Sequence, residues 1–409
     1  MAEEIIAGLD IGTTKVSVLI GERDGDELNI LGIGTAHSDG LRRGVIVNME
    51  KTIQAIAQAA ETAERTAGVE ISTVYAGIAG EHIQSVNSRG AIAIPRGDLG
   101  IAAKDIARAF EAAKALQIPM DRQVIHLLPQ EFIVDDQRGI PDPKGMHGVR
   151  LEVLVHIVTG ATTSVQNQFK CIKQAGLELG EMVLDSYASS YSVLSSDEKE
   201  LGVVLLDMGG GTTDLAVFFE GSIRHSSVIP LGGRNITSDI AIGLRTPLDQ
   251  AEEIKRQHCS AVNGASEQEA LIEVPAVGGR STRKISSEQL SSIVGPRMEE
   301  IFSFANREIK KSGYDDLLGA GVVVTGGGAL MPGTVELAEQ VFGMPAQLGV
   351  PQKVSGLVDA DTAPLHATGI GLIRYGMSQQ ESNEWSGKSQ NGMLGRMAGR
   401  MRQWFDDLS

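Results

Sequence analysis

Two segments of this chain repeat one another in outline, and the repeat restricts the folds open to the chain. EIIAGLDIGTTKVSVLI at 4–20 and LGVVLLDMGGGTTDLAVFF at 201–219 each place an aspartate and a Gly/Thr turn between two β-rich apolar runs. This pattern is typical of a β-hairpin whose turn residues supply positive φ angles. Because the segments lie about one domain length apart, the sequence predicts two related α/β halves. A third glycine turn follows a strand-like run in GVVVTGGGALMP at 321–332.

The length and charge of the chain restrict its partners. Its 409 residues are enough for two or more domains, and 36 basic against 52 acidic side chains give a formal charge of −16. This excess of acid argues against nucleic acid as a main partner, because phosphate binding needs concentrated lysine and arginine.

The cysteines, the N-terminus and the apolar runs bear on location. Cys171 and Cys259 show neither metal-ligand spacing nor a disulfide framework, which favours a reducing compartment. The acidic N-terminus is unlike a signal peptide, and no apolar run reaches the length of a membrane span. We therefore expect the body of the protein in the cytoplasm.

Between and after the hairpins the pattern changes from one module to the next. Residues 83–158 combine strand-like runs at 124–134 and 150–158 with a helical segment, so we expect an inserted α/β module there. Residues 378–390 are polar and lack periodicity, which predicts a flexible linker. Helical apolar spacing recurs at 50–68, 101–117, 246–258 and 286–311.

The two Gly/Thr turns have the composition of a triphosphate site. Glycines let backbone amides approach an anion closely, and threonine hydroxyls add donors. Lys15 supplies a cation beside the β- and γ-phosphates, and Asp10 and Asp207 stand at matching strand ends where they can hold Mg²⁺ through water. A single turn of this kind is also what an ordinary hairpin uses. The predicted phosphate-binding residues are Gly12, Thr13, Thr14, Lys15, Gly209, Gly210, Gly211, Thr212 and Thr213.

Three motifs in this order carry a resemblance to a superfamily. DIGTTK at 10–15, DMGGGTTD at 207–214 and TGGGA at 325–329 resemble the phosphate-1, phosphate-2 and adenosine motifs of the actin, Hsp70 and sugar-kinase superfamily. The resemblance implies a duplicated α/β ATPase core that binds ATP with Mg²⁺. It also implies that the third motif contacts adenosine through Gly326, Gly327, Gly328 and Ala329.

Other segments extend this resemblance. Glu252 and Lys255 resemble the pair with which bacterial actins clasp ribose and base, although an E-x-x-K pair is more often a solvated helix face. LDSYASSYSVL at 184–194 and TAPLHATGIGLIRYG at 362–376 resemble the two helices that cross between the halves. Asp185 then lies near the position of the residue that orients attacking water, which makes it the candidate catalytic residue.

Four regions are similar to the bacterial cell-division family FtsA. They are LRRGVIVNMEKTIQAI at 41–56, the insertion at 83–158, the stretch 274–301 and the amphipathic C-terminus. The resemblance implies an adaptor that binds ATP, self-associates, captures the C-terminal tail of FtsZ and ties the Z ring to the membrane. Hydrolysis of ATP is expected to be weak or absent, and the protein is not expected to be primarily a metabolic enzyme.

The same resemblance implies partners and a location. Arg283 and Arg297 would contact the acidic FtsZ tail, since guanidinium groups pair with carboxylates at two points. Other division proteins would bind the insertion. The protein would lie peripherally on the cytoplasmic face of the cell membrane at the division site.

The resemblance also divides the chain into subdomains. The first actin-like half takes 1–82, 159–192 and 362–377, and 83–158 is inserted in it. The second half takes 193–242 and 317–361, and 243–316 is the subdomain that docks FtsZ. The linker at 378–390 precedes a membrane-targeting amphipathic helix at 391–409.

That terminal helix has one apolar face, because its large apolar residues recur at three- and four-residue steps. Arg396, Arg400 and Arg402 flank the face, as in a helix that lies on anionic lipid. A helix docked on its own protein would show the same pattern. The predicted membrane contacts are Met393, Leu394, Met397, Met401, Trp404, Phe405 and Leu408.

Other functions are compatible with the phosphate hairpins. A sugar-type kinase of the same superfamily would need a general-base carboxylate near the γ-phosphate and no lipid-binding tail. The related pilus-assembly actin homologue shares the inserted subdomain but is disfavoured by the tail. An Hsp70-type chaperone would need a peptide-binding domain after residue 376, for which the chain is too short.

Overall fold

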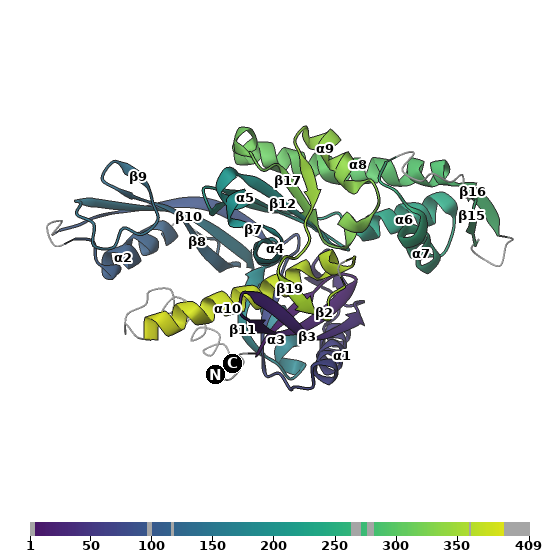
Figure 1. Ribbon diagram of the computed structural model, residues 1–409, viewed down its shortest axis with the longest axis horizontal. Helices are drawn as coiled ribbons and strands as arrows, with labels where there is room; N and C mark the ends of the chain where they lie inside the picture. Colours follow the sequence, from purple (N-terminus) through teal and green to yellow (C-terminus); the bar gives the residue numbers. More distant parts are fainter. Residues whose placement is uncertain are drawn as a thin grey trace.

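The computed structural model describes residues 5–95, 100–115, 118–262, 271–275, 282–359 and 361–387, with the backbone alone for 381–387. Two halves are each built on a mixed sheet, and a smaller sheet extends sideways between them (Figure 1). The predicted duplicated α/β core with an inserted subdomain is therefore confirmed.

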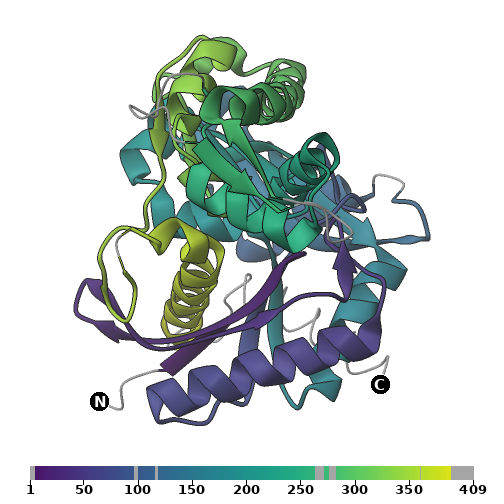
Figure 2. The same cartoon turned by 90° about the vertical axis from the view of Figure 1, so that its right-hand side faces the viewer.

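The sheet of the first half has six strands in the order β11-β6-β1-β2-β3-β19. The side chains of β2 alternate between two cores, because successive residues of a strand point to opposite faces. Val18 and Ile20 face α1 (Met49–Ala67) and α3 (Thr162–Gln174), whereas Leu19 faces α10 (Ala367–Gly387). Figure 2 shows this sheet lying between α1 and α10. The strands are β1 (Ile5–Ile11), β2 (Lys15–Asp24), β3 (Glu27–His37), β6 (Thr73–Ile78), β11 (Glu178–Leu184) and β19 (Val354–Gly356).

Local signals fix α1 on this sheet. Asn48 caps its N-terminus by accepting a hydrogen bond from the Lys51 amide, and Gly68 ends it in a left-handed conformation. A Cβ on Gly34 of β3 would lie 1.9 Å from the Ala59 carbonyl oxygen, so glycine is required where the helix crosses the strand.

The sheet of the second half has five strands in the order β14-β13-β12-β17-β18. Its hairpin pairs Asp207 with Asp214, as the first hairpin pairs Asp10 with Ser17. In both halves the hairpin's first strand also has a parallel neighbour, which reproduces the predicted repeat. The strands are β12 (Val203–Met208), β13 (Thr213–Phe219), β14 (Ser222–Ile229), β17 (Val322–Thr325) and β18 (Ala346–Leu348).

Helices cover both faces of this second sheet. The larger core lies under α6 (Gly233–Leu244), α7 (Leu248–His258), α8 (Ser287–Ser312) and α9 (Thr334–Phe342). The opposite face packs on α4 (Asp185–Val193), with α5 (Ser196–Leu201) beside it. The remaining short elements are β4 (Leu41–Arg42), β5 (Val45–Ile46), β15 (Leu271–Val274), β16 (Arg283–Ser286), η2 (Asp315–Leu317), η3 (Gly327–Leu330) and η4 (Ala363–His366).

The inserted subdomain is a four-stranded antiparallel sheet with one helix on it. The sheet has the order β7-β10-β8-β9, and Ala109, Phe110 and Ala113 of α2 (Ala103–Lys114) bury one of its faces. The strands are β7 (Gln84–Ala93), β8 (Arg122–Val134), β9 (Gln137–Ile140) and β10 (Arg150–Ala161).

Polar side chains attach the insertion to the second half. The Asn87 and Gln130 amides donate to the carbonyls of Arg224 and Ile223, each at 2.8 Å. His156 Nε2 lies 2.9 Å from Ser226 Oγ. All three acceptor or partner residues belong to β14, the edge strand of the second sheet, so the insertion covers that edge. A module inserted in the first half is thus hydrogen-bonded to the second.

The predicted flexible linker at 378–390 is wrong for residues 378–387, because α10 continues through Gly387. Glycine and proline are absent between Met377 and Ser386, so the helix started by the buried residues 367–377 can extend. Residues 388–390 and the predicted membrane helix at 391–409 lie outside the described residues. Within the part of the chain that the structure describes, no helix has the length and apolarity of a membrane span.

The docking of the insertion makes stability depend on pH. Burial lowers the pKa of His156 to about 3, and the neighbouring His225 and His126 lower it further. The folded protein keeps this ring neutral, whereas the unfolded chain protonates it near its ordinary value. The ring's contribution to stability is therefore complete above about pH 6.5 and falls as the pH drops, by up to about 1.4 kcal/mol per pH unit.

We expect His156→Gln to have a shallower loss of unfolding free energy between about pH 7 and pH 5 than the unchanged protein. Denaturant titrations at several pH values measure both slopes. Comparing the two proteins separates His156 from the buried carboxyl groups, which act in the opposite direction. Equal slopes would contradict the prediction.

Candidate functional site

The two Gly/Thr turns meet face to face between the halves. A Cβ on Gly210 would lie 2.5 Å from Thr14 Oγ1, and one on Gly211 would lie 2.4 Å from Thr13 Oγ1. Thr13 cannot easily move aside, because its hydroxyl accepts a hydrogen bond from the Gly44 amide at 3.0 Å. The structure thus brings both predicted hairpins into one site.

The reason for glycine in these turns differs from the prediction. The sequence led us to expect positive φ angles, but Gly12, Gly209, Gly210 and Gly211 do not have them. The turns close instead through matching backbone bonds, from Gly12 to Lys15 at 3.0 Å and from Gly209 to Thr212 at 2.9 Å. Crowding between the two halves, and not backbone conformation, excludes a side chain at 210 and 211.

The hydroxyls of the second hairpin already have protein partners. Thr212 donates to Asp214 at 3.0 Å, and the fully buried Thr213 donates to the Leu231 carbonyl at 2.9 Å. In this conformation the hairpin therefore offers its backbone amides to an anion. From the sequence, we had expected both hydroxyls to donate to the phosphates as well.

Four buried carboxyl groups interact with one another beneath the turns, and two of them interact with Lys15. Burial raises the pKa of Asp10 to about 6, which Lys15 opposes and Asp207 reinforces. Burial and the neighbouring aspartates also raise the pKa of Asp214 to about 8 and that of Asp185 well above its ordinary range. The pKa of Lys15 is lowered by burial, against the attraction of Asp10 and Asp207. The nucleotide-free site holds more acid than one lysine can neutralise.

This donor set fits a hydrated divalent cation. Among the described residues, no three His, Cys, Asp or Glu side chains are close enough to hold a metal ion directly. Asp185 Oδ1 and Asp214 Oδ1 are nevertheless buried without a hydrogen-bond partner. Buried carboxylate oxygens without donors are suited to a cation that keeps its water ligands, as Mg²⁺ does.

The third glycine turn lies against the second hairpin. Gly326 has a φ of +84°, and a Cβ there would lie 2.4 Å from Asp207 Oδ1. A Cβ on Gly328 would lie 2.8 Å from the Met208 Cβ. Gly327 and Ala329 belong to η3 in the same turn. All four predicted adenosine residues therefore border the phosphate hairpins.

Lys255 is largely buried, whereas its partner Glu252 has a side chain that is 43% exposed. The Lys255 side chain is 14% exposed, and its Nζ donates to Glu252 at 2.7 Å and to Thr237 at 2.9 Å. It also donates to the Gly233 carbonyl at 3.2 Å, and the Gly233 amide donates to Gly209. Burial acts to raise the pKa of Glu252, but hydrogen bonds and charge from Lys255, with help from Thr237, lower it. The pair is thus linked to the second phosphate hairpin through α6.

Asp185 is the first residue of α4. Its Oδ1 is 2.3 Å from the position of a Cβ on Gly77, so it sits tightly against the first sheet. Its catalytic role stays a prediction.

Sequence reasoning missed several residues that complete the site. The register Asp207↔Asp214 was available from the hairpin pattern and could have identified Asp214. Thr237, Ser189 and Thr368 carried no such signal, because only tertiary packing brings their hydroxyls to Glu252 and Asp207.

The two arginines predicted to bind FtsZ are not side by side. Arg283 is exposed on β16, whereas Arg297 lies ten residues into α8, about 15 Å along the helix. Arg297 already pairs with Asp239 at 2.6 Å and with Glu300.

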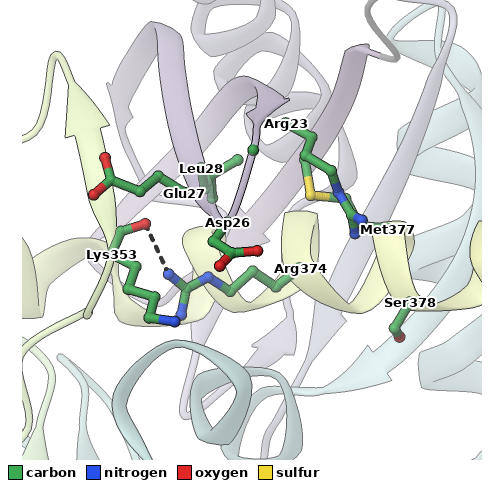
Figure 3. Close-up of a pocket in the computed structure, with 9 residues that line it drawn as sticks. Arg23, Asp26, Glu27, Leu28, Lys353, Arg374, Met377 and Ser378 are labelled. Atoms are coloured by element: carbon green, nitrogen blue, oxygen red, sulfur yellow. Dashed lines mark hydrogen bonds between the residues drawn. The ribbon is translucent and has the colours of Figure 1, made fainter.

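A pocket of about 340 Å³ lies elsewhere, where the β2–β3 turn meets α10 (Figure 3). Arg374 crosses it and donates to the Lys353 carbonyl at 3.1 Å. Acidic and basic side chains both line this pocket, and it contains no predicted nucleotide residue. The lining residues are Arg23, Gly25, Asp26, Glu27, Leu28, Lys353, Arg374, Met377 and Ser378.

The contact between the hairpins predicts the effect of one methyl group. Gly211→Ala would force Thr13 or the second hairpin to move, which costs about 1–3 kcal/mol in a packed region. We expect nucleotide affinity, measured by calorimetry, to fall about tenfold or more. Gly295→Ala is the matched control, because its Cβ would lie 3.7 Å from the nearest atom. Equal affinities for both variants would refute the crowding argument.

The chain matches two family models and several solved structures. A model of "Cell division protein FtsA" matches residues 204–371, and a model of the "SHS2 domain inserted in FTSA" matches residues 80–159. Among solved structures, a PilM–PilN type IV pilus biogenesis complex has a TM-score of 0.66 at 16% identity, covering 91% of this chain and 98% of that one. MreB5 of Spiroplasma citri bound to ADP has a TM-score of 0.57 at 15% identity, covering 93% and 98%. Likeness at these identities shows the fold alone.

Curated relatives are much more similar in sequence. The cell division protein FtsA of Pseudomonas aeruginosa is 48% identical, covering 92% of this chain and 90% of the relative. That of Neisseria meningitidis is 45% identical over 99% of both chains, and that of Escherichia coli K12 is 36% identical over 93% and 92%. Relatives this similar over nearly their whole length establish that the chain belongs to the FtsA family of cell division proteins.

Proposed function

We propose that this protein is an ATP-binding adaptor that self-assembles, binds the C-terminal tail of FtsZ and ties FtsZ filaments to the cytoplasmic face of the cell membrane at the division site. The observation that carries the proposal is the meeting of the two phosphate hairpins, one from each half. A ligand held by both turns favours the closed arrangement of the halves and can thereby bias assembly.

The hairpins support ATP with Mg²⁺ as the ligand. The Gly12 and Gly209 amides close the two turns, and the other backbone amides of the turns would bind the phosphates. Lys15 would turn toward the β- and γ-phosphates. Asp10 and Asp207 would hold Mg²⁺ through water. When bound, Mg²⁺ neutralises phosphate charge and offsets the excess of buried carboxylate. The adenosine would lie between the 326–329 turn and Glu252.

The same carboxyl groups support slow hydrolysis. Burial and neighbouring charge raise the pKa of Asp214 to about 8 and that of Asp185 well above its ordinary range. The ionised form that would accept a proton from attacking water is thereby disfavoured at both residues. We therefore place the nucleotide's role in assembly.

The subdomain at 243–316 supports the docking of an acidic tail. Arg283 is exposed on β16, beside Lys284. Arg297 is held by Asp239 and Glu300, so a tail carboxylate would compete with these two residues for the guanidinium. Two large apolar side chains are exposed on the same subdomain and can contact apolar residues of a peptide: Leu248 at 57% and Leu271 at 65%.

The membrane role rests on the predicted amphipathic helix. The helix α10 extends to Gly387, and the predicted membrane helix at 391–409 follows after residues 388–390. Partial burial of the apolar face and the cost of ordering the helix nearly cancel, so a single copy should bind weakly. Several copies held together, by self-assembly or along an FtsZ filament, would bind strongly.

A co-sedimentation assay tests the adaptor proposal. FtsZ, ATP and anionic liposomes are mixed with the intact protein or with a variant that ends at residue 392. We expect the intact protein to carry FtsZ into the liposome pellet and the truncated variant to leave it in solution. Failure of the intact protein to bring FtsZ to lipid would refute the proposal.

A peptide-binding assay tests the arginines separately. Arg283→Ala should weaken binding of a labelled FtsZ tail peptide about tenfold, because a charge-assisted hydrogen bond is lost. Lys284→Ala is the matched control, since Lys284 is exposed on the same strand and pairs with Glu273 at 3.5 Å. An equal effect of both variants would mean that general charge, and not Arg283, holds the peptide.

A further inference from the structure

We propose that Ser189 and Thr368 are positioning residues of the nucleotide site, which fix the Asp207 carboxylate so that its free oxygen receives the water shell of Mg²⁺. The inference rests on the proposed binding of ATP with Mg²⁺. It assigns a role to two hydroxyls that lie on the helices crossing between the halves.

Both hydroxyls bind the same oxygen of Asp207. Ser189 Oγ donates to Asp207 Oδ2 at 2.6 Å, and Thr368 Oγ1 donates to the same oxygen at 3.0 Å. The two hydroxyls lie 3.1 Å from each other. Two donors at one carboxylate oxygen fix the rotation of the whole group.

The other oxygen, Oδ1, lies beside the third glycine turn. A Cβ on Gly326 would be only 2.4 Å from it, and Gly326 has none. With Oδ2 bound by the two hydroxyls, Oδ1 is the oxygen of Asp207 that faces the third glycine turn. A partial rotation of the carboxylate would break both hydroxyl bonds and move Oδ1 away from this turn.

The hydroxyls also favour the charged form of Asp207. Burial raises the pKa of this carboxyl, and the Ser189 and Thr368 hydrogen bonds oppose the rise, as does Lys15. A carboxylate that binds a hydrated cation must be ionised, so donors to Oδ2 assist binding at Oδ1.

Both crossing segments thereby contact the charged groups of the site. Ser189 lies in α4, and Thr368 lies in the first turn of α10. One turn earlier, the Leu365 carbonyl accepts a hydrogen bond from Lys15 Nζ at 2.6 Å. The segment 365–368 thus holds Lys15 from the first half and Asp207 from the second. Binding of a nucleotide to Lys15 and binding of Mg²⁺ to Asp207 would therefore both act on the segment 365–368.

A purely structural role has to be separated from positioning. The two hydroxyls could serve only to join α4 and α10. Ser192 supplies the control, because its hydroxyl donates to the Ala367 carbonyl at 2.7 Å and so joins the same helices. Ser192 is also buried, and its hydrogen bonds go to Ala367 and Ser189 carbonyls, away from the Asp207 carboxylate.

The test measures how much Mg²⁺ strengthens nucleotide binding. Binding of a fluorescent, non-hydrolysable ATP analogue is titrated in EDTA and in excess Mg²⁺, for the full-length protein and its variants. We expect Ser189→Ala with Thr368→Val to reduce the gain from Mg²⁺ about tenfold or more, because two hydrogen bonds to a charged group are lost. Binding in EDTA should change little. Ser192→Ala should keep the full gain.

Two further variants test the Thr368 hydroxyl by itself. Thr368→Ser retains the hydroxyl and should restore the gain that Thr368→Val loses, and this pair is compared directly if the double variant does not fold. A full gain from Mg²⁺ in Thr368→Val, or an equal loss in Ser192→Ala, would overturn the proposal. If the unchanged protein binds no nucleotide in either condition, the proposed ATP function itself fails.

Discussion

The closeness of two backbone turns governs the rest of this structure. Gly210 and Gly211 from one half approach Thr14 and Thr13 from the other so closely that no Cβ fits between them. Each turn is held at the end of a buried hairpin, so neither can retreat without disturbing a sheet. The proposed phosphate site therefore lies beside the line of contact between the halves. A ligand held by both turns would interact with both halves at once.

Charge makes this contact sensitive to a ligand. Asp10, Asp185, Asp207 and Asp214 are buried close to one another, and burial raises the pKa of each of these carboxyls. Lys15 opposes this rise at Asp10 and Asp207. A triphosphate with Mg²⁺ would add positive metal charge beside these carboxyls, and the free energy of its binding would depend on how far apart the halves stand.

The inserted subdomain connects the two halves at a second place. Its strands leave the first half, but Asn87, Gln130 and His156 attach it to β14 of the second. A change in the angle between the halves must either carry the insertion with the second half or break these bonds. In the self-assembly that we propose, an element attached to both halves would transmit a change in their relative position to the protein surface.

The sequence alone was sufficient for everything that depends on local pattern. Periodicity and turn composition determined both hairpins, the third glycine turn and the insertion, because these rest on residues close together in the chain. The family came from the resemblance of whole segments to known sequences. Pattern failed at 378–387, where polarity indicated a linker and the buried start of α10 extended a helix instead. The pattern also gave the wrong reason for the hairpin glycines. Glycine is required there by contact with the other hairpin, which lies about one domain length away in the sequence. Only the tertiary structure could place Ser189 and Thr368 on Asp207, or Thr237 on Glu252, because a hydroxyl bond across such sequence separations leaves no mark on local composition.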